Sequence, residues 1–345
     1  MGNLLAYSGT TTKIRAIRSH LLTEHHFRKL ASMSNVTEAL LYLKKQSGYK
    51  DLFAHADETS LHRSGIEKIL TQTTHLDFQK IYRFATIRQR QFLDLYFHRY
   101  EISILKTCMR MVFDHRDIKL DLTIFEEFFQ KHSDIDLRKI SSSDSIENFV
   151  ENLKGSIYYV PLKRLFGIVH PTLWDYEMAI DLFYFKWFWK NSKKVFKKNY
   201  EDYFKESYGI KMDLLNIRWI HRSKKYFQMT NTQIYALLIP INYHLQKEDI
   251  RALVEAATAD EFAAAVKNTY YGRRYEHYCV DTLDETYYSI RHSVQRKLAK
   301  KDPYSVATVI SYLSEKEHEV SKLIVTLEGV RYRLSQSEIL EYIKQ

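Results

Sequence analysis

The chain has 345 residues, of which 45% are hydrophobic, and a formal net charge of +10, so it can bury a core and is not a disordered protein. Nine glycines and four prolines are too few for the tight turns of a β-sandwich, a β-barrel or a parallel α/β sheet, and this favours an all-α fold. Two cysteines exclude a disulfide scaffold and a four-cysteine zinc site, and no apolar run reaches the roughly 18–20 residues of a membrane span.

Three similar helices recur along the chain, each opened by a capping box in which a glutamate follows the cap by three residues. The boxes are Asn35–Glu38, Asp144–Glu147 and Thr258–Glu261. Apolar residues and a lysine follow each box, and then come tyrosines, at Tyr49, Tyr158–Tyr159 and Tyr270–Tyr271. The caps lie 109 and 114 residues apart, close to one third of the chain.

A helical segment that mixes apolar and basic residues precedes each capped helix, at Ile14–Arg18, Leu105–Arg110 and Ile217–Arg222. The recurrence of both elements in the same order predicts three homologous helical-bundle units about a pseudo-threefold axis. We expect these units at residues 1–90, 91–200 and 201–280. Residues 281–345 form C-terminal helices that pack with the first unit or bridge units.

The C-terminal region has one long apolar stripe at helical spacing, from Val306 to Leu327. The pattern predicts a helix that begins at Pro303, since proline favours the first turn, and ends at Gly329. Ser335 and Glu338 then predict a capping box for a last short helix.

The basic residues of the repeated segments are the first candidate partner-binding residues: Arg15, Arg18, Lys106, Arg110, Arg218 and Arg222. If the three units surround an axis, these side chains could line a central concavity and present positive charge to an inserted acidic helix pair. The alternative is that they form structural ion pairs with neighbouring helices or extend their charged ends into solvent.

A second candidate is the basic and aromatic stretch 186–198, and its partner-binding candidates are Lys193, Lys194, Lys197 and Lys198. One interpretation is nucleic-acid binding, with lysines on phosphates and aromatic rings on bases. Another is docking onto an anionic membrane face. The third is a helix whose aromatic side chains pack inward and whose lysines face solvent. The same alternatives apply to Arg291, Arg296, Lys297, Lys300 and Lys301.

Motifs for catalysis and cofactor binding are missing from the sequence. It contains no G-x-G, no G-x-x-x-x-G-K, no H-E-x-x-H and no G-x-S-x-G. Cys108 lies on the apolar face of a helical segment, which is typical of a small core residue. We therefore expect no catalytic, cofactor or metal site. A basic helical nucleic-acid-binding protein and a helical enzyme with few motifs remain as alternative functions.

The sequence resembles the family of C subunits of V/A-type ATPases, which is related to the d subunit of eukaryotic vacuolar ATPases. The resemblance rests on Tyr7 with Ile14–Ser19, on the Asp-x-x-Asn segment Met212–Arg218, and on the ending from Tyr312 to Ile339. It extends over essentially the whole chain. In the second unit, Ile102–Leu105 stands where the family pattern expects Asp/Glu-x-x-Asn.

This resemblance implies a non-catalytic, funnel-shaped protein of three helical domains within a rotary ATPase. Such a protein lies peripherally on the cytoplasmic face of the membrane, on the proteolipid ring, and receives the foot of the rotor shaft made by the D and F subunits. It couples ATP hydrolysis or synthesis to proton or sodium transport. The resemblance further implies no cofactor and no nucleic-acid partner, and a monomer when isolated.

Overall fold

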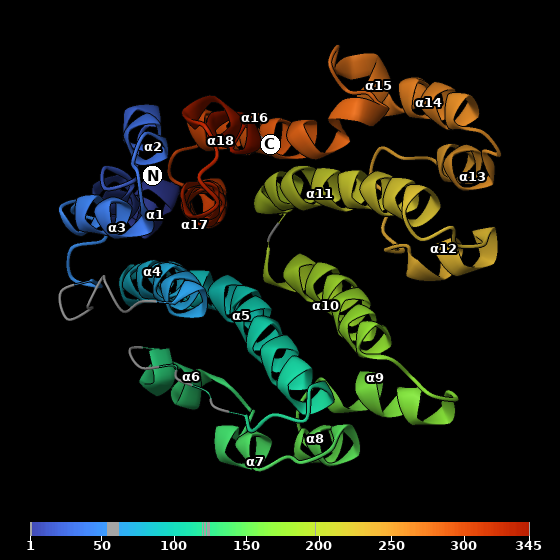
Figure 1. Ribbon diagram of the computed structural model, residues 1–345, viewed down its shortest axis with the longest axis horizontal. Helices are drawn as coiled ribbons and strands as arrows, with labels where there is room; N and C mark the ends of the chain where they lie inside the picture. Colours follow the sequence, from blue (N-terminus) through green and yellow to red (C-terminus); the bar gives the residue numbers. More distant parts are fainter. Residues whose placement is uncertain are drawn as a thin grey trace. The chain divides into compact units, whose positions relative to one another are not determined.

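The computed structural model describes residues 2–53, 62–118, 120, 122, 125–196 and 198–344, and every regular element within these ranges is a helix (Figure 1). The predicted all-α fold is confirmed. Among the described helices, none is both long and apolar enough to cross a bilayer. The chain forms two compact bodies, and the predicted division into three units, the pseudo-threefold axis and the funnel shape stay predictions.

The terminal body combines both ends of the chain, Met1–Thr86 and Tyr275–Gln345. Its helices are α1 (Gly2–Arg18), α2 (Glu24–Ala31), α3 (Val36–Lys44), α4 (Arg63–Phe84), the short 3₁₀ helix η3 (Val280–Thr282), α16 (Leu283–Lys301), α17 (Val306–Arg331) and α18 (Gln336–Tyr342). Figure 1 shows α17 and α18 beside α2 and α3, although these pairs lie at opposite ends of the sequence. The long helix α17 is the central element of this body.

The core of the terminal body forms where α17 meets α3 and α4. Leu323 and Leu327 of α17 belong to one buried cluster with Leu40 and Leu43 of α3 and Leu70 of α4. Burial of a leucine side chain contributes roughly 1.5–3 kcal/mol, so this cluster ties the two ends of the chain together.

The expected ends of the helix over 303–329 were both wrong. Ser305 is the N-cap of α17, because its hydroxyl accepts a hydrogen bond from the Ala307 N–H, and Pro303 therefore lies outside the helix. At the other end α17 continues past Gly329 to Arg331. Gly329 is needed for packing instead: a Cβ atom there would lie 2.6 Å from Cγ1 of Ile339 on α18.

Replacing Gly329 by alanine is expected to lower the free energy of unfolding by up to about 2 kcal/mol. Overpacking against Ile339 costs roughly 1–3 kcal/mol and outweighs the gain of about 1 kcal/mol in helix propensity. Gly9→Ala is the matched control, because Gly9 lies within α1 with no atom within 4 Å of its would-be Cβ. Urea unfolding should show stabilisation for Gly9→Ala and destabilisation for Gly329→Ala; two shifts of the same sign would contradict this packing argument.

The middle body is the continuous segment Ile87–Arg274. Its helices are α5 (Ile87–Phe113), α6 (Glu126–His132), α7 (Leu137–Ser141), α8 (Ile146–Asn152), α9 (Tyr159–Lys163), the 3₁₀ helix η2 (Arg164–Gly167), α10 (Leu173–Val195), α11 (Lys198–Lys225), α12 (Asn231–Leu237), α13 (Lys247–Glu255), α14 (Ala259–Asn268) and α15 (Tyr270–Arg274). Helices α5 and α10 pack together along their lengths.

Aromatic side chains hold the long helices of the middle body together. Phe188 of α10 lies 6.1 Å from Phe92 of α5 and 5.7 Å from Phe204 of α11, measured between ring centroids. Cys108 of α5 is fully buried, as predicted, and burial raises the pKa of its thiol to about 12. A thiol with so high a pKa is a core residue and not a nucleophile.

The capped helices are confirmed at two of the three predicted positions, where Asn35 and Thr258 accept hydrogen bonds from the N–H groups of Glu38 and Glu261. The middle cap was wrong by one residue. Helix α8 begins at Ile146, and Ser145 is its N-cap, accepting a hydrogen bond from Asn148 N–H at 3.2 Å. Asp144 and Glu147 therefore do not form the expected capping box.

Candidate functional site

A groove of about 890 Å³ opens on the terminal body between α1, α16, the first turns of α17 and the loop before α2. We call it the basic groove. Its lining includes Thr11, Arg15, Arg18, Leu21, Leu22, Thr23, Glu24, His292, Arg296, Ala299, Lys300, Pro303, Thr308, Ser311 and Glu315. Two of the predicted partner-binding residues, Arg15 and Arg18, thus lie beside two members of the basic cluster on α16.

One arginine of the groove is held in place by its neighbours. Arg18 Nε donates to Glu315 Oε2 at 2.8 Å, and the guanidinium lies 5.9 Å from the ring centroid of Tyr312. The second nitrogen, Nη2, is buried and has no hydrogen-bond partner. Arg18 is therefore oriented by the protein while part of its hydrogen-bonding capacity stays unused.

The remaining cations of the groove are more exposed. The Arg15 guanidinium lies over the ring of Tyr304 at 5.8 Å. Arg296 and Lys300 lie one helical turn apart on the exposed side of α16, and within the described part of the chain their side chains form no ion pair or hydrogen bond. These two positive charges are available to a partner.

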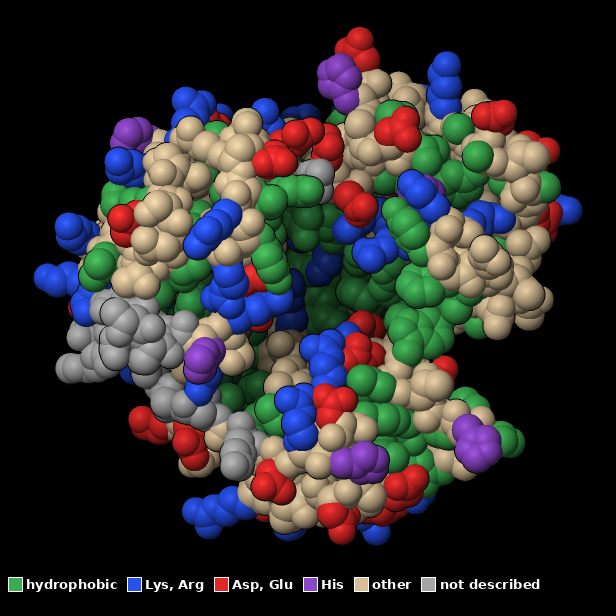
Figure 2. All heavy atoms as spheres, viewed as in Figure 1, with side chains coloured by type: hydrophobic (Ala, Val, Ile, Leu, Met, Phe, Trp, Pro, Cys, Tyr) green, Lys and Arg blue, Asp and Glu red, His purple; other side chains and the backbone are tan. Residues whose placement is uncertain are grey.

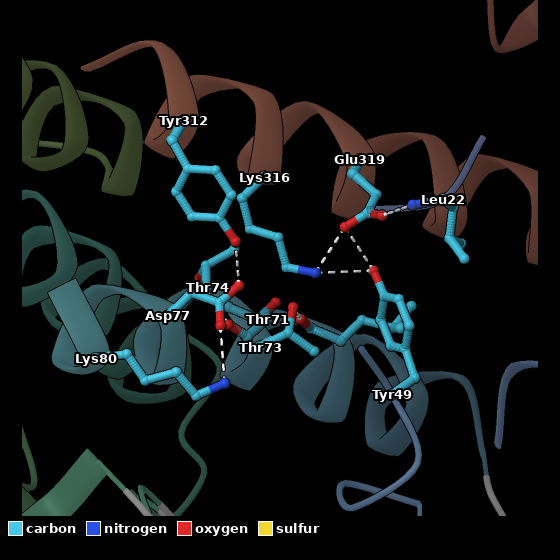
Figure 3. Close-up of polar contacts among 11 residues, drawn as sticks. Leu22, Tyr49, Thr71, Thr73, Thr74, Asp77, Lys80, Tyr312, Lys316 and Glu319 are labelled. Atoms are coloured by element: carbon cyan, nitrogen blue, oxygen red, sulfur yellow. Dashed lines mark hydrogen bonds and ion pairs between the residues drawn. The ribbon is translucent and has the colours of Figure 1, made fainter. Parts of the chain in front are cut away.

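A buried polar network beside the groove fixes α17 against the N-terminal helices (Figure 3). Glu319 of α17 is 5% exposed and accepts hydrogen bonds from Tyr49 Oη at 2.9 Å, from Lys316 Nζ at 2.6 Å and from Leu22 N–H at 2.5 Å. Burial and the nearby Glu319 carboxylate raise the pKa of Tyr49, which keeps its hydroxyl protonated as a donor. Leu22 also lines the groove, so this network holds the groove wall.

A second buried carboxylate joins α17 to α4. Tyr312 Oη donates to Asp77 Oδ2 at 2.6 Å, and Lys80 Nζ donates to Asp77 Oδ1 at 3.0 Å. Figure 3 shows both contacts on the same side of α17 as Lys316. Because its polar partners are side chains of two different helices, Asp77 restricts their relative sliding.

The same kind of contact recurs in the middle body around Glu101 of α5, which is 1% exposed. Tyr158, which follows the capped helix α8, donates its hydroxyl to Glu101 Oε2 at 2.6 Å. Ser133, in the loop before α7, donates to Glu101 Oε1, and His98 Nδ1 contacts the other oxygen. A carboxylate on a long helix thus again holds a tyrosine and a loop.

A third copy forms around Asp213 of α11, which is fully buried. Tyr271 Oη donates to Asp213 Oδ2 at 2.8 Å, and the N–H groups of Tyr243, His244 and Leu245 donate to the two carboxylate oxygens at 2.7–3.1 Å. Burial raises the pKa of Asp213, and these four donors oppose the rise.

The Asn of the Asp-x-x-Asn segment supports the same loop as Asp213. Asn216 Nδ2 donates to the carbonyl of Ile239, and Asn216 Oδ1 accepts from the N–H of Ile239, both at 2.9 Å. In α5 the counterpart of Asp213 is Glu101, one residue before the stretch 102–105. The acidic residue expected from the family pattern is therefore present, whereas Ile104 stands where the asparagine would be.

We name these three contacts the tyrosine–carboxylate clasps. Each joins a carboxylate on a long helix (α17, α5 or α11), a loop before a short helix (α2, α7 or α13) and a tyrosine after a capped helix (α3, α8 or α14). The first clasp takes its carboxylate from the C-terminal α17 and its tyrosine from the N-terminal segment.

The sequence pattern indicates the three tyrosines of the clasps. It does not reveal their acidic partners, because the spacings between these carboxylates, 112 and 106 residues, differ from the spacings between the caps.

The clasps also show which basic residues occupy equivalent positions relative to the carboxylate of their helix. Lys106 and Arg218 each lie five residues after the carboxylate of their helix, whereas the position five residues after Glu319 is Ile324. Arg15 is on α1, which bears no clasp carboxylate. The clasps therefore align Lys106 with Arg218 and do not place Arg15 with them, because the clasp of the terminal body uses α17 and not α1.

Two predicted residues of the middle body form ion pairs between α5 and α10. Lys106 Nζ contacts Asp181 Oδ2 at 2.5 Å, and Arg110 Nε contacts Glu177 Oε1 at 2.7 Å. These pairs, like Arg18 with Glu315, are the ion pairs between neighbouring helices that the sequence offered as the alternative to partner binding. On α11, Arg218 is partly buried and Arg222 is exposed. Partner binding by these residues stays a prediction.

The basic and aromatic stretch is helical over its part in α10. Phe188 is fully buried, whereas Lys193 and Lys194 are exposed. Lys193 Nζ lies 5.1 Å from the ring centroid of Trp189, and Lys194 Nζ donates to Asn191 Oδ1 at 3.3 Å. Aromatic side chains thus pack inward and lysines face solvent. Lys197 and the side chain of Lys198 lie outside the described residues.

Charges of both signs are interspersed on the face drawn in Figure 2. Within the described ranges, no three His, Cys, Asp or Glu side chains come together in a way that could hold a metal ion.

Comparison with known proteins agrees with the resemblance found in the sequence. The sequence model of the ATP synthase (C/AC39) subunit family matches residues 10–342. Relatives named as C subunits of A-type ATP synthases include those of Methanosphaera stadtmanae (22% identical, over 98% of this chain and 87% of the relative), Methanosarcina mazei (24%, 98% and 92%) and Pyrococcus horikoshii (22%, 98% and 90%). Because the family match spans nearly the whole sequence, the chain belongs to the ATP synthase (C/AC39) subunit family, and the resemblance to the C subunits of V/A-type ATPases is confirmed.

Proposed function

We propose that the chain is a non-catalytic central-stalk subunit of a V/A-type rotary ATPase. In this role it is a socket that couples the rotor shaft, made by the D and F subunits, to the membrane proteolipid ring. ATP hydrolysis or synthesis is thereby linked to proton or sodium transport. The observation that carries the proposal is the family match over residues 10–342, with relatives named as C subunits of A-type ATP synthases that cover 98% of the chain.

The internal contacts support such a role, because a coupling element has to transmit torque without deforming. In the terminal body, Glu319 and Asp77 tie α17 to the segment before α2, to Tyr49 and to α4. In the middle body, Glu101 and Asp213 tie α5 and α11 to the short helices that follow them. Buried hydrogen-bonded networks of this kind rigidify a structure, since breaking one leaves an uncompensated buried charge.

Two exposed basic regions are the partner surfaces of this proposal. The basic groove faces the shaft, and the lysines of α10, which include Lys193 and Lys194, face the membrane sector. Near anionic headgroups each lysine contributes about 1 kcal/mol, so a pair assists docking and does not suffice for it. Lys193→Glu with Lys194→Glu is accordingly expected to weaken association with the membrane sector by at least roughly thirtyfold at low salt, measured by co-sedimentation with membranes. Unchanged association would show that these lysines are only the solvent-exposed face of a helix and do not bind the membrane sector.

The test of the function is affinity purification of the tagged chain from gently solubilised membranes of the source organism, with co-purifying proteins identified by mass spectrometry. The proposal predicts recovery of the shaft subunits and the proteolipid. Recovery of nucleic acid without any ATPase subunit would refute it and would favour a basic nucleic-acid-binding protein.

A further inference from the structure

We propose that the basic groove of the terminal body binds an acidic protein segment, a stretch of chain whose Asp or Glu side chains reach Arg15, Arg18, Arg296 and Lys300. The inference deepens the proposed function and rests on it in one respect, namely that the segment belongs to the shaft. All residues that line the groove belong to the terminal body.

The groove has an excess of positive charge. Four permanent cations line the groove, and two carboxylates, Glu24 and Glu315, oppose them. Glu315 is engaged with Arg18, while Arg296 and Lys300 have no internal partner among the described residues. An acidic segment would supply the missing partners, and complementary charge fixes the orientation and raises the association rate of a complex.

The size and lining of the groove favour a protein segment over a compact anion. A volume of about 890 Å³ is far larger than a phosphate needs and lies in the range of pockets for larger ligands. Leu21, Leu22, Ala299 and Pro303 give the lining apolar surface, which suits the side chains of a peptide. The two carboxylates would repel a dense polyphosphate, but they can accept hydrogen bonds from a mixed peptide.

The groove is also preorganised on two sides. Arg18 is oriented by Glu315 and Tyr312, while about a third of its side chain (34%) stays exposed to the groove. Leu22 is fixed through its N–H to the buried Glu319. A wall that does not have to be ordered on binding lowers the entropic cost of association.

Helix α16 offers a matched pair of variants for the test. Arg296→Glu with Lys300→Glu reverses two charges that line the groove, and Lys297→Glu with Lys301→Glu reverses two exposed charges of the same helix that do not. Both pairs have the same spacing and change the net charge equally. Surface substitutions of this kind alter stability by only about 0.5 kcal/mol, so both variants should fold.

The probes are the purified D–F shaft, a poly-L-glutamate peptide and vesicles of anionic phosphatidylglycerol, with affinities measured at low and physiological salt. The inference predicts that the groove variant binds shaft and peptide at least about tenfold more weakly than the wild type, and that the control variant binds both within about twofold of it. Equal peptide binding by the two variants would overturn the inference. A loss confined to the vesicles would overturn it in favour of a lipid surface.

The two levels of the proposal can fail separately. In one outcome, the wild-type chain does not bind the shaft, and peptide binding is lost in the groove variant and kept in the control variant. The groove then binds acidic segments, and the assignment of the segment to the shaft fails. If the wild-type chain binds the shaft and the groove variant binds it equally well, the coupling role stands and the groove is not the shaft site.

Discussion

Replacing Asp213 by alanine is expected to lower the free energy of unfolding of the middle body by roughly 3–5 kcal/mol, which corresponds to a fall in Tm on the order of 10 °C. The substitution leaves four hydrogen-bond donors around a buried site without their acceptor, namely Tyr271 Oη and the N–H groups of residues 243–245. Each unsatisfied buried donor costs about 1–3 kcal/mol, although water entering the cavity recovers part of this.

Two control variants separate the clasp from general effects. Tyr271→Phe removes one of the four hydrogen bonds and should cost about 1 kcal/mol, whereas Asp260→Ala, at an exposed position of α14, should cost under about 0.5 kcal/mol. All four tryptophans lie within residues 87–274, so tryptophan fluorescence during urea unfolding reports on the middle body. If Asp213→Ala unfolds at the same urea concentration as Asp260→Ala, the clasp contributes nothing to stability.

Acidification from pH 7.5 to pH 4.5 is expected to destabilise the terminal body through two histidines. Burial lowers the pKa of His75 to about 4, and burial with the nearby Lys322, His292 and Arg291 lowers the pKa of His318 to about 4. Their ordinary pKa is 6.5. Well above pH 6.5 both imidazoles are neutral in the folded and in the unfolded chain, so they do not reduce the free energy of unfolding. As the pH falls below 6.5 the unfolded chain takes up protons that the folded chain does not, and about 3 kcal/mol per histidine is lost by pH 4.

The measurement is the free energy of unfolding against pH for the wild type, His75→Asn and, as a control, His25→Gln. His25, which is exposed on α2, is the control for replacing a histidine of the same body. His75→Asn should flatten the slope between pH 4 and 6.5 whatever its stability at neutral pH. A wild-type slope that survives in His75→Asn would show that His75 does not titrate as described.

Local sequence signals predicted much of the fold. The all-α class followed from the low glycine and proline content, and the caps at Asn35, Thr258 and Ser335 followed from side chains that bond to the backbone three residues away. Such contacts depend on neighbours in the sequence, so a pattern can find them. The inward packing of Phe188, with Lys193 exposed on the same helix, likewise follows from helical periodicity.

Contacts between distant residues could not be predicted in the same way. Gly329 was expected to end a helix, and only the approach of Ile339 on α18 shows that it serves packing. Glu319 and Tyr49 are 270 residues apart, and their contact exists because the ends of the chain form one body. The segments Ile14–Arg18, Leu105–Arg110 and Ile217–Arg222 were matched by local composition, which carries no information on which helix bears the clasp. The groove forms only because α1, α16 and α17 line one hollow of the folded terminal body.

The coupling role can be measured in a V/A-type ATPase complex of the source organism that has been stripped of this chain and reconstituted in sealed vesicles. ATP hydrolysis and proton or sodium uptake are measured in parallel. A coupling role predicts hydrolysis without ion transport in the depleted complex, and restored transport when the purified chain is added back. Ion transport at the full rate in vesicles that lack the chain would contradict that role.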